Sequence, residues 1–400
     1  MNWTPQQDRA LQQVRQWQTT RSKPYLTFAG YAGTGKTTLA KHLAEGVSGT
    51  VYFAAFTGKA AHVLIKKGVP NASTIHKLIY LPRDKCTAHL LELRRQRDLL
   101  LGLRPRDEAA VALIDKKILA EQANLHRPDF TLNVDSPLWT ASLLVIDEYS
   151  MVDEQMGKDL LYFGCPILAL GDPGQLPPIR GRQFFSGKPD VMLDEIHRQA
   201  ADNPIIRMSK DVREGKRLLP GNYGQSSVLR QTGVSDSQLG AMVLAANQIL
   251  VGMNATRRQF NTYVKELRNL RDPLPEPGDK LVCRRNNSRE GLLNGQMWTV
   301  KRSTKKGSLR LDLVGEEGEE IKCLSHKHRF EGRDLDLDSM PPHERRAANE
   351  FDYGYALTVH TSQGSQWDRV LLLDEWRGSN RKEWLYTGIT RAAETVTVVQ

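Results

Sequence analysis

The sequence predicts an α/β protein with two domains, each built on a parallel sheet. Short apolar segments alternate with segments of helical spacing in the first third of the chain, and this alternation returns near the C-terminus. Near-continuous apolar strands are typical of parallel sheets, because helices cover both faces of such a sheet. The length of 400 residues leaves room for two or three domains.

The first domain is expected to contain four buried strands and two early helices. The strands are predicted at 24–30, 50–56, 142–148 and 165–172, and the helices at 37–46 and 58–68. Residues 83–138 interrupt this alternation and are interpreted as an insertion. Its first part has helical composition but carries Gly102 and Pro105, and the segments PDFTLNV and DSPLW after it suggest a hairpin.

The second half of the chain predicts another α/β domain that a small β module interrupts. A helix is expected at 203–215, and a strand followed by a helix at 248–270. Short alternating segments separated by GLLNGQ and KKGS indicate the β module at 278–330. Strands and helices of the α/β type resume at 351–364 and continue to 395–399.

Composition excludes several classes of protein and favours few. With 40% hydrophobic and 26% charged residues, wholesale disorder is excluded, and no apolar run approaches the length of a membrane span. The polar N-terminus lacks the apolar core of a signal peptide, and the cysteines show no paired spacing, so we expect a cytoplasmic protein without a membrane partner. The formal net charge of +10 is compatible with a polyanionic partner and equally with none.

A phosphate-binding loop is the most specific motif in the sequence. Residues 30–37 (GYAGTGKT) fit the pattern G-x-x-x-x-G-K-[ST] and lie between a predicted strand and a predicted helix. Glycines allow the backbone N–H groups to surround a phosphate, and the helix N-terminus favours the anion. In this pattern Lys36 would neutralise the β- and γ-phosphates, and the Thr37 hydroxyl would bind Mg²⁺.

Acidic and amide side chains follow two further predicted strands. Asp147 and Glu148 end one of them; Asp147 would hold Mg²⁺ and Glu148 would activate the attacking water. An isolated Asp-Glu pair is more often a solvated turn, and the phosphate loop is what favours the catalytic interpretation. Gln175 follows the next strand in a Gly/Pro loop, where it could sense the γ-phosphate or simply belong to a tight turn.

The ordered set of motifs resembles the superfamily 1B helicases, especially the RecD-like and Dda-like group of bacteria and phages. The resemblance extends over nearly the whole chain. Besides the phosphate loop, it is carried by TPQQ (4–7), FTGKAA (56–61), STIH (73–76), DEYSM (147–151), GDPGQLPPI (171–179), LDEIHRQ (193–199), ALTVHTSQGSQ (356–366) and YTGITRA (386–392). One departure is Thr361, where the family often has lysine.

This resemblance implies two RecA-like P-loop NTPase domains, the second with an SH3-like β-barrel insertion. The implied boundaries are 1–200 for the first domain, 201–278 with 341–400 for the second, and 279–340 for the insertion. Residues 83–138 would hold a pin that splits the duplex, and Phe130 and Trp139 are the nearest aromatic candidates.

The resemblance also implies ATP and Mg²⁺ as ligands and assigns roles to individual residues. Catalytic roles fall on Lys36, Asp147, Glu148, Gln175, Arg198 near the γ-phosphate and Arg391 as the arginine finger. Nucleotide contacts fall on Gln7 as the adenine reader and on Gly30, Ala32, Gly33, Thr34, Gly35, Lys36, Thr37 and Thr38, with Thr37 and Asp147 at the metal. Contacts with the nucleic-acid strand fall on Thr57, Gly58, Lys59, Thr74, His76, Thr358, His360, Ser362 and Gln363.

The function implied is that of a monomeric, ATP-dependent DNA helicase that moves 5′→3′ on single strands and opens forked duplexes in replication, recombination or repair. The polarity depends on the resemblance alone. An RNA or dual-specificity helicase and a non-unwinding, strand-stimulated ATPase remain alternatives, and a single-strand-binding protein is a conceivable partner. His76 and His360 could instead be structural histidines, and Cys323, His326 and His328 lack the fourth ligand of a zinc site.

Overall fold

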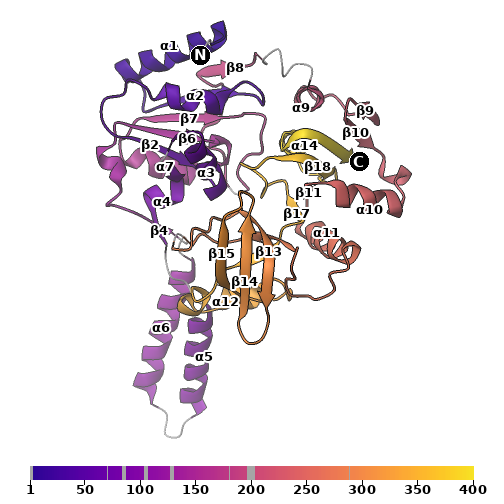
Figure 1. The fold of residues 1–400 in the computed structure, drawn as a ribbon. Helices are drawn as coiled ribbons and strands as arrows, with labels where there is room; N and C mark the ends of the chain where they lie inside the picture. Colours follow the sequence, from indigo (N-terminus) through magenta and orange to yellow (C-terminus); the bar gives the residue numbers. More distant parts are fainter. Residues whose placement is uncertain are drawn as a thin grey trace.

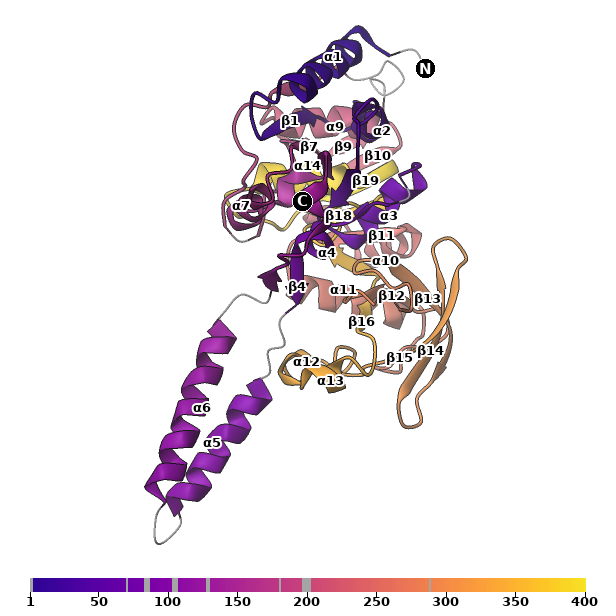
Figure 2. The same ribbon diagram turned by 90° about the vertical axis from the view of Figure 1, so that its left-hand side faces the viewer.

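The computed structural model describes residues 3–69, 71–82, 87–102, 107–126, 130–179, 181–195, 203–287 and 289–400. Two α/β domains lie side by side, a β module packs beside the second, and a pair of helices projects away from the body (Figures 1 and 2).

The first domain is built on a parallel sheet in the strand order β3-β2-β6-β7-β1-β8, as far as the described residues show. Its strands are β1 (Tyr25–Gly30), β2 (Val51–Ala55), β3 (Ser73–Thr74), β6 (Leu143–Asp147), β7 (Ile167–Gly171) and β8 (Val191–Leu193). One face is covered by α1 (Pro5–Thr20) and α2 (Lys36–Leu43), and the other by α4 (Ile75–Ile79) and α7 (Glu154–Tyr162). The prediction of a parallel α/β sheet is confirmed.

Short α3 (Gly58–Lys66) follows β2 and packs against β2 and β3. Every residue of the central strands β6 and β7 is buried, which explains their uninterrupted apolar sequence. The carboxyl ends of β1, β2, β6 and β7 meet at one edge of the sheet, so the motifs that follow these strands are brought together there.

The insertion is a helical hairpin formed by α5 (Thr87–Gly102) and α6 (Glu108–His126), which stands clear of the domains in both views (Figures 1 and 2). At its base, β4 (Tyr80–Pro82) pairs antiparallel with β5 (Phe130–Leu132). The predicted hairpin between PDFTLNV and DSPLW is therefore wrong. Pro137–Thr140 forms a 3₁₀ turn instead, because Pro137 fits its first position and the Ser136 hydroxyl accepts from Leu138 N.

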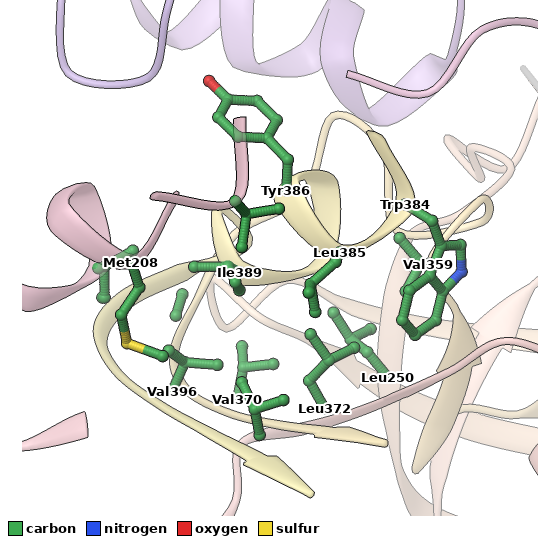
Figure 3. Close-up of a cluster of buried hydrophobic side chains, with 14 of the residues drawn as sticks. Met208, Leu250, Val359, Val370, Leu372, Trp384, Leu385, Tyr386, Ile389 and Val396 are labelled. Atoms are coloured by element: carbon green, nitrogen blue, oxygen red, sulfur yellow. The ribbon is translucent and has the colours of Figure 1, made fainter. Parts of the chain in front are cut away.

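The second domain has a sheet in the order β17-β11-β18-β19-β10-β9, parallel except for the β9–β10 pair. Its strands are β9 (Gly221–Tyr223), β10 (Ser226–Leu229), β11 (Gln248–Val251), β17 (Ala356–Thr358), β18 (Trp367–Leu373) and β19 (Ala392–Val399). The helices are α9 (Pro204–Arg213), α10 (Asp236–Ala245), α11 (Asn254–Leu267) and α14 (Arg381–Ile389). Figure 3 shows the apolar side chains of α14 packed onto this sheet.

The β module is an antiparallel sheet in the order β15-β14-β13-β12-β16. Its strands are β12 (Lys280–Cys283), β13 (Met297–Thr304), β14 (Leu309–Gly315), β15 (Glu320–Ser325) and β16 (Phe351–Tyr353), and α12 (Asp334–Ser339) and α13 (Pro342–Arg345) precede β16. Strand β16 lies beyond the expected end of the module at residue 340 and pairs with β12. Leu281 and Trp298 of the module share one core with Ile249 and Leu371 of the second domain, so the two are packed as one unit.

None of the helices described has both the length and the apolar character needed to cross a membrane.

Candidate nucleotide and strand site

The phosphate loop has the backbone conformation that its glycines permit. Gly33 and Gly35 adopt φ angles of 82° and 81°, in the left-handed region that side chains with a Cβ avoid. A Cβ on Gly30 would lie 2.6 Å from the Thr34 hydroxyl, so this position also requires glycine. The loop leads directly into the N-terminus of α2, whose free N–H groups favour an anion.

Lys36 lies folded over its own loop. Its Nζ donates to the carbonyl oxygens of Gly30 (2.5 Å) and Tyr31 (3.0 Å) and lies 4.0 Å from a carboxylate oxygen of Asp172. A phosphate in the loop would compete with these two neutral carbonyls, since a charge-assisted contact is the stronger one. The side chains of Thr37 and Thr38 lie outside the described part of the structure, although the backbone of both belongs to α2.

Asp147 and Glu148 stand where the sequence placed them, at the end of β6. Glu148 has a φ of 61°, a left-handed conformation that is strained for a residue with a side chain and that often marks a functional site. Its N–H donates to Asp147 Oδ1 at 3.0 Å. Burial, and then the neighbouring Glu148 carboxylate, raise the pKa of Asp147 above its ordinary value, against the opposing charge of Lys36. A cation would stabilise the ionised form, so the site fits Mg²⁺.

A cleft of about 620 Å³ brings residues of both domains to this loop. Its lining includes Lys36, Asp147, Glu148 and Gln175 from the first domain and Arg391 from the second. Gln175 Oε1 is buried and has no hydrogen-bond partner, so this amide is available to a ligand. The structure thus brings together five of the six predicted catalytic residues. Arg198 lies outside the described residues.

Arg391 is buried and held by the backbone of its own domain. Its Nε donates to Thr387 O at 3.1 Å and its Nη1 to Ser365 O at 3.2 Å. These contacts orient the guanidinium at the cleft wall while leaving it bonded only to neutral groups. An anionic oxygen would therefore be a stronger partner than those it has.

Tyr386 is a site residue that the sequence reasoning missed. It points away from the apolar core below α14 (Figure 3). Its hydroxyl donates to Asp172 Oδ2 at 2.6 Å and accepts from Ala32 N, in the phosphate loop, at 3.0 Å. Tyr386 stands five residues before Arg391 in the last motif, which was the available signal. It joins the second domain directly to the phosphate loop of the first.

Two further contacts strengthen the junction between the domains beside Tyr386. Leu176 N donates to Thr387 Oγ1 at 3.0 Å, and Gln363 Nε2 donates to Leu176 O at 3.2 Å. Gln363, predicted to contact a strand, therefore bridges the two domains. Arg213 of α9 also crosses the junction, and its Cζ lies 3.4 Å from the centre of the Tyr31 ring. Arg213 belongs to no motif, so the sequence did not point to it.

Gln7, the expected adenine reader, is buried at the start of α1. Its Oε1 accepts from Thr4 N at 3.0 Å, which closes a capping box, and its Nε2 donates to Thr34 O at 3.3 Å. The amide thereby ties the N-terminus of α1 to the phosphate loop. This places Gln7 beside the candidate nucleotide site.

The short polar residues predicted to contact the nucleic-acid strand lie at the carboxyl ends of the β-strands β2, β3 and β17. Thr57 and Thr74 cap α3 and α4 by accepting from Ala60 N (3.1 Å) and Lys77 N (3.2 Å). Thr358 shares a hydrogen bond of 2.9 Å with Thr361, the residue that departs from the family pattern. Ser362 is buried and donates to Val359 O at 2.8 Å.

The two predicted histidine contacts are both partly buried among aromatic rings. His76 lies 5.2 Å from Phe130 and 5.5 Å from Tyr80, measured between ring centres. His360 lies 5.5 Å from Trp376. Burial is the first cause that lowers the pKa of each histidine, so both are neutral near pH 7. They suit hydrogen bonding or stacking better than ion pairing.

The two aromatic candidates for the pin lie in different surroundings. Phe130 is 40% exposed at the base of the helical hairpin, beside His76. Trp139 packs edge-on against Tyr162 and Phe163 and donates Nε1 to Val134 O at 2.8 Å. Phe130 is the one that adjoins a predicted strand contact. Neither residue lies on α5 or α6.

Comparison with known proteins agrees with this geometry. Residues 2–233, more than half of the chain, match the protein family described as AAA domain. The chain belongs to this AAA-domain family. Residues 353–399 also match the UvrD-like helicase C-terminal domain.

Curated relatives place this AAA-domain chain more narrowly. It is 25% identical to the ATP-dependent RecD2 DNA helicase of Deinococcus radiodurans, over 92% of this chain and 46% of the relative. It is 28% identical to the ATP-dependent DNA helicase dda of Enterobacteria phage T4, over 48% of this chain and 39% of the relative. Together with the motif order, these matches place the chain in the RecD-like and Dda-like group of superfamily 1B helicases. The chain spans less than half the length of either relative.

Solved structures of Pif1 helicases share the fold. A Pif1 structure that addresses DNA unwinding at forked duplexes has a TM-score of 0.55 at 17% identity, over 99% of this chain and 92% of that one. Bacteroides Pif1 bound to single-stranded DNA has a TM-score of 0.54 at 16% identity, with the same coverage. Pif1 helicase from Candida albicans has a TM-score of 0.52 at 16% identity, over 100% and 94%.

Proposed function

We propose that the chain is an ATP-dependent DNA helicase that moves 5′→3′ along single-stranded DNA. The observation that carries this proposal is the cleft in which Lys36, Asp147 and Glu148 of one domain face Arg391 of the other. A phosphate loop alone would suit many nucleotide-binding proteins. Catalytic groups divided between two domains couple hydrolysis to the relative position of those domains, as a motor requires.

The positions of the described groups support a role for each, and the roles of Arg198 and of the Thr37 side chain follow from the motifs alone. Lys36 and the loop N–H groups would bind the β- and γ-phosphates, and Glu148 would orient and deprotonate the attacking water. Arg391, Gln175 and Arg198 would stabilise the charge that develops on the γ-phosphoryl oxygens. Mg²⁺ held by Thr37 and Asp147 would neutralise phosphate charge, and Gln7 would read the adenine. The remaining predicted contacts of the phosphate loop, between Gly30 and Thr38, would bind the phosphates of the nucleotide.

The strand would lie across the carboxyl ends of β2, β3 and β17. Hydroxyl groups, backbone N–H groups and neutral histidines contact phosphates, sugars and bases without reading sequence, so binding should be sequence-tolerant. We further propose that the antiparallel module at 279–340 is an SH3-like barrel closed by β16, between the parts of the second domain at 201–278 and 341–400. The first domain would then be 1–200, with the pin in 83–138.

The proposed substrates are single-stranded and forked DNA. We propose that the helicase acts as a monomer in the cytoplasm. Its candidate partners are single-strand-binding proteins and proteins of replication or recombination. This assignment rests on the relatives named above and on the cleft.

Strand displacement on three forks tests the proposal. One fork carries only a 5′ tail, one only a 3′ tail, and one has blunt ends. We expect ATP-dependent displacement of the 5′-tailed fork alone. Displacement of only the 3′-tailed fork would refute the polarity. DNA-stimulated hydrolysis without displacement of any fork would show an accessory ATPase, and stimulation by RNA but not DNA would show an RNA-directed enzyme.

A further inference from the structure

One face of α3 carries three basic side chains beside the cleft. Lys59, His62 and Lys66 stand at positions i, i+3 and i+7, which places them on the same side of a helix. Lys59 belongs to the predicted strand contacts, whereas no motif includes His62 or Lys66. We call this set the α3 basic face. All three residues line the cleft.

An acidic turn of the β module covers the α3 basic face. The turn joins β14 to β15 and contains Glu316 and Glu317. Glu316 Oε2 accepts from Lys59 Nζ at 3.0 Å, and the Glu317 carboxylate pairs with Lys66 and lies 3.6 Å from His62 Nε2. These contacts join parts of the chain more than 250 residues apart.

The shape of the turn presents these two carboxylates outward. Gly318 adopts a φ of 86°, so the chain reverses tightly at this point. Glu319 folds back into the module, where its side chain accepts from Glu317 N at 3.1 Å and from Gln296 Nε2 at 3.0 Å. Glu320 on β15 pairs with Lys301 on β13. Of the four described glutamates from 316 to 320, Glu316 and Glu317 are therefore the two that pair with the first domain.

A second contact seats the module over the start of α3. A Cβ on Gly58 would lie 3.1 Å from Leu293 Cβ and 3.3 Å from Asn286 Oδ1, so the loop before β13 packs directly on this glycine. Lys59 Nζ also lies 5.0 Å from the centre of the Trp367 ring in the second domain. The β module thus covers Gly58 and Lys59, the part of α3 predicted to contact the nucleic-acid strand.

We propose that the α3 basic face binds the phosphate backbone of the strand, with His62 and Lys66 as additional contacts, and that the acidic turn competes with the strand for it. This inference rests on the proposed function. Carboxylates and phosphates are alternative partners for the same cations, and a strand offers several negative charges at once. Because Glu316 and Glu317 are 44% and 46% exposed, their ion pairs are weak enough for a strand to displace.

The test compares Glu316→Gln/Glu317→Gln with the wild-type chain in binding a fluorescent oligothymidylate at fixed salt. Two half-exposed ion pairs at their usual strength predict that the variant binds between about twofold and thirtyfold more tightly. The matched control is Glu320→Gln/Asp336→Asn, which removes the same charge from two exposed carboxylates that pair within the module. Equal tightening in both variants would reduce the effect to net charge and overturn the proposal.

Adding Lys66→Gln to the Glu316→Gln/Glu317→Gln variant tests the contact itself. Most of the gained affinity should disappear if Lys66 binds the strand once it is uncovered. Undiminished affinity would show that the α3 basic face is not a strand contact.

A measurement without nucleic acid separates this inference from the proposed function. Acylation of Lys59 and Lys66 by a small activated ester, followed by peptide mass spectrometry, should be faster in Glu316→Gln/Glu317→Gln than in wild type. Lys158 on α7 is the internal control, because its partner Glu154 is untouched. Unchanged acylation would refute the covering turn. If acylation is faster in the variant but the wild-type chain binds no nucleic-acid strand, the covering turn stands, and the proposed function and the competition are refuted.

Discussion

The hydroxyl of Tyr386 offers the sharpest test of how the two domains cooperate. Tyr386→Phe keeps the buried ring and removes only the oxygen that meets Asp172 and Ala32 N. Both Tyr386 and Asp172 are 1% exposed, so water cannot replace the lost contacts. Asp172 Oδ1 keeps its bond from Gly174 N at 2.9 Å, so the carboxylate stays in place.

The size of the effect follows from these contacts. A hydrogen bond to a buried charged group contributes about 1.5–3 kcal/mol, and the amide bond from Ala32 adds about 1 kcal/mol. Together the two bonds amount to about 2.5–4 kcal/mol, and losing them from the closed arrangement would change the closure equilibrium about 10²–10³-fold. Since Arg391 follows α14, the helix that carries Tyr386, by two residues, we expect kcat for ATP hydrolysis to fall by a similar factor of about 10²–10³.

Steady-state hydrolysis with saturating oligothymidylate measures this change. Tyr223→Phe is the matched control, because the hydrogen bonds described for the Tyr223 hydroxyl are with the backbone of Leu219 in its own domain. A kcat for Tyr386→Phe equal to that of Tyr223→Phe, or higher than wild type, would refute the inference that this bridge supports the hydrolysing arrangement.

Three further predictions address single groups. Lys36→Ala should abolish ATP hydrolysis and fork opening while most oligonucleotide binding remains. Normal ATP turnover by this variant would refute the assignment of the phosphate site. Glu148→Gln should lower kcat by about 10²–10⁴-fold with ATP binding retained, as measured by filter binding and hydrolysis rates. Burial alone would raise the pKa of Glu350, but the guanidinium groups around it, Arg345 first, lower that pKa to about 2. Its contribution of about 3 kcal/mol to the free energy of unfolding should be complete above about pH 4.5 and vanish as pH falls towards 2; denaturant titrations should show this loss in wild type and not in Glu350→Gln.

Local motifs could be predicted from the sequence, because the chain itself brings their residues together. The phosphate loop needs only Gly33 and Gly35 in left-handed conformations and a strand and helix on either side. The same holds for Asp147 and Glu148, which follow one apolar strand. Helices α5 and α6 were expected as helical sequence within an insertion.

Contacts between distant parts of the chain could not be predicted in this way. Tyr386 and Ala32 are 354 residues apart, and nothing in the spacing of either motif encodes their meeting. The acidic turn likewise has the composition of an ordinary solvated loop until the fold sets it on α3. Residues 351–353 were expected to belong to the second α/β domain, whereas β16 pairs with β12 of the module. The sequence hides this change of sheet, because Gly354 alone separates the three buried residues of β16 from the next apolar strand.

The junction between the domains links the nucleotide side of the cleft to the strand side. Gly364 of the second domain adopts a φ of 76°, and a Cβ there would lie 3.2 Å from Thr57 Oγ1 of the first. Tyr386 meets Ala32 on the nucleotide side of the same junction. Because the second domain and the β module share one core, a rotation that separates Tyr386 from Ala32 would also move Gly364 from Thr57 and the acidic turn from α3. One rigid movement would therefore alter the phosphate site, the path of the nucleic-acid strand and the acidic turn over the α3 basic face together. We therefore expect strand binding to change the rate of ATP hydrolysis, and the bound nucleotide to change the affinity for the strand.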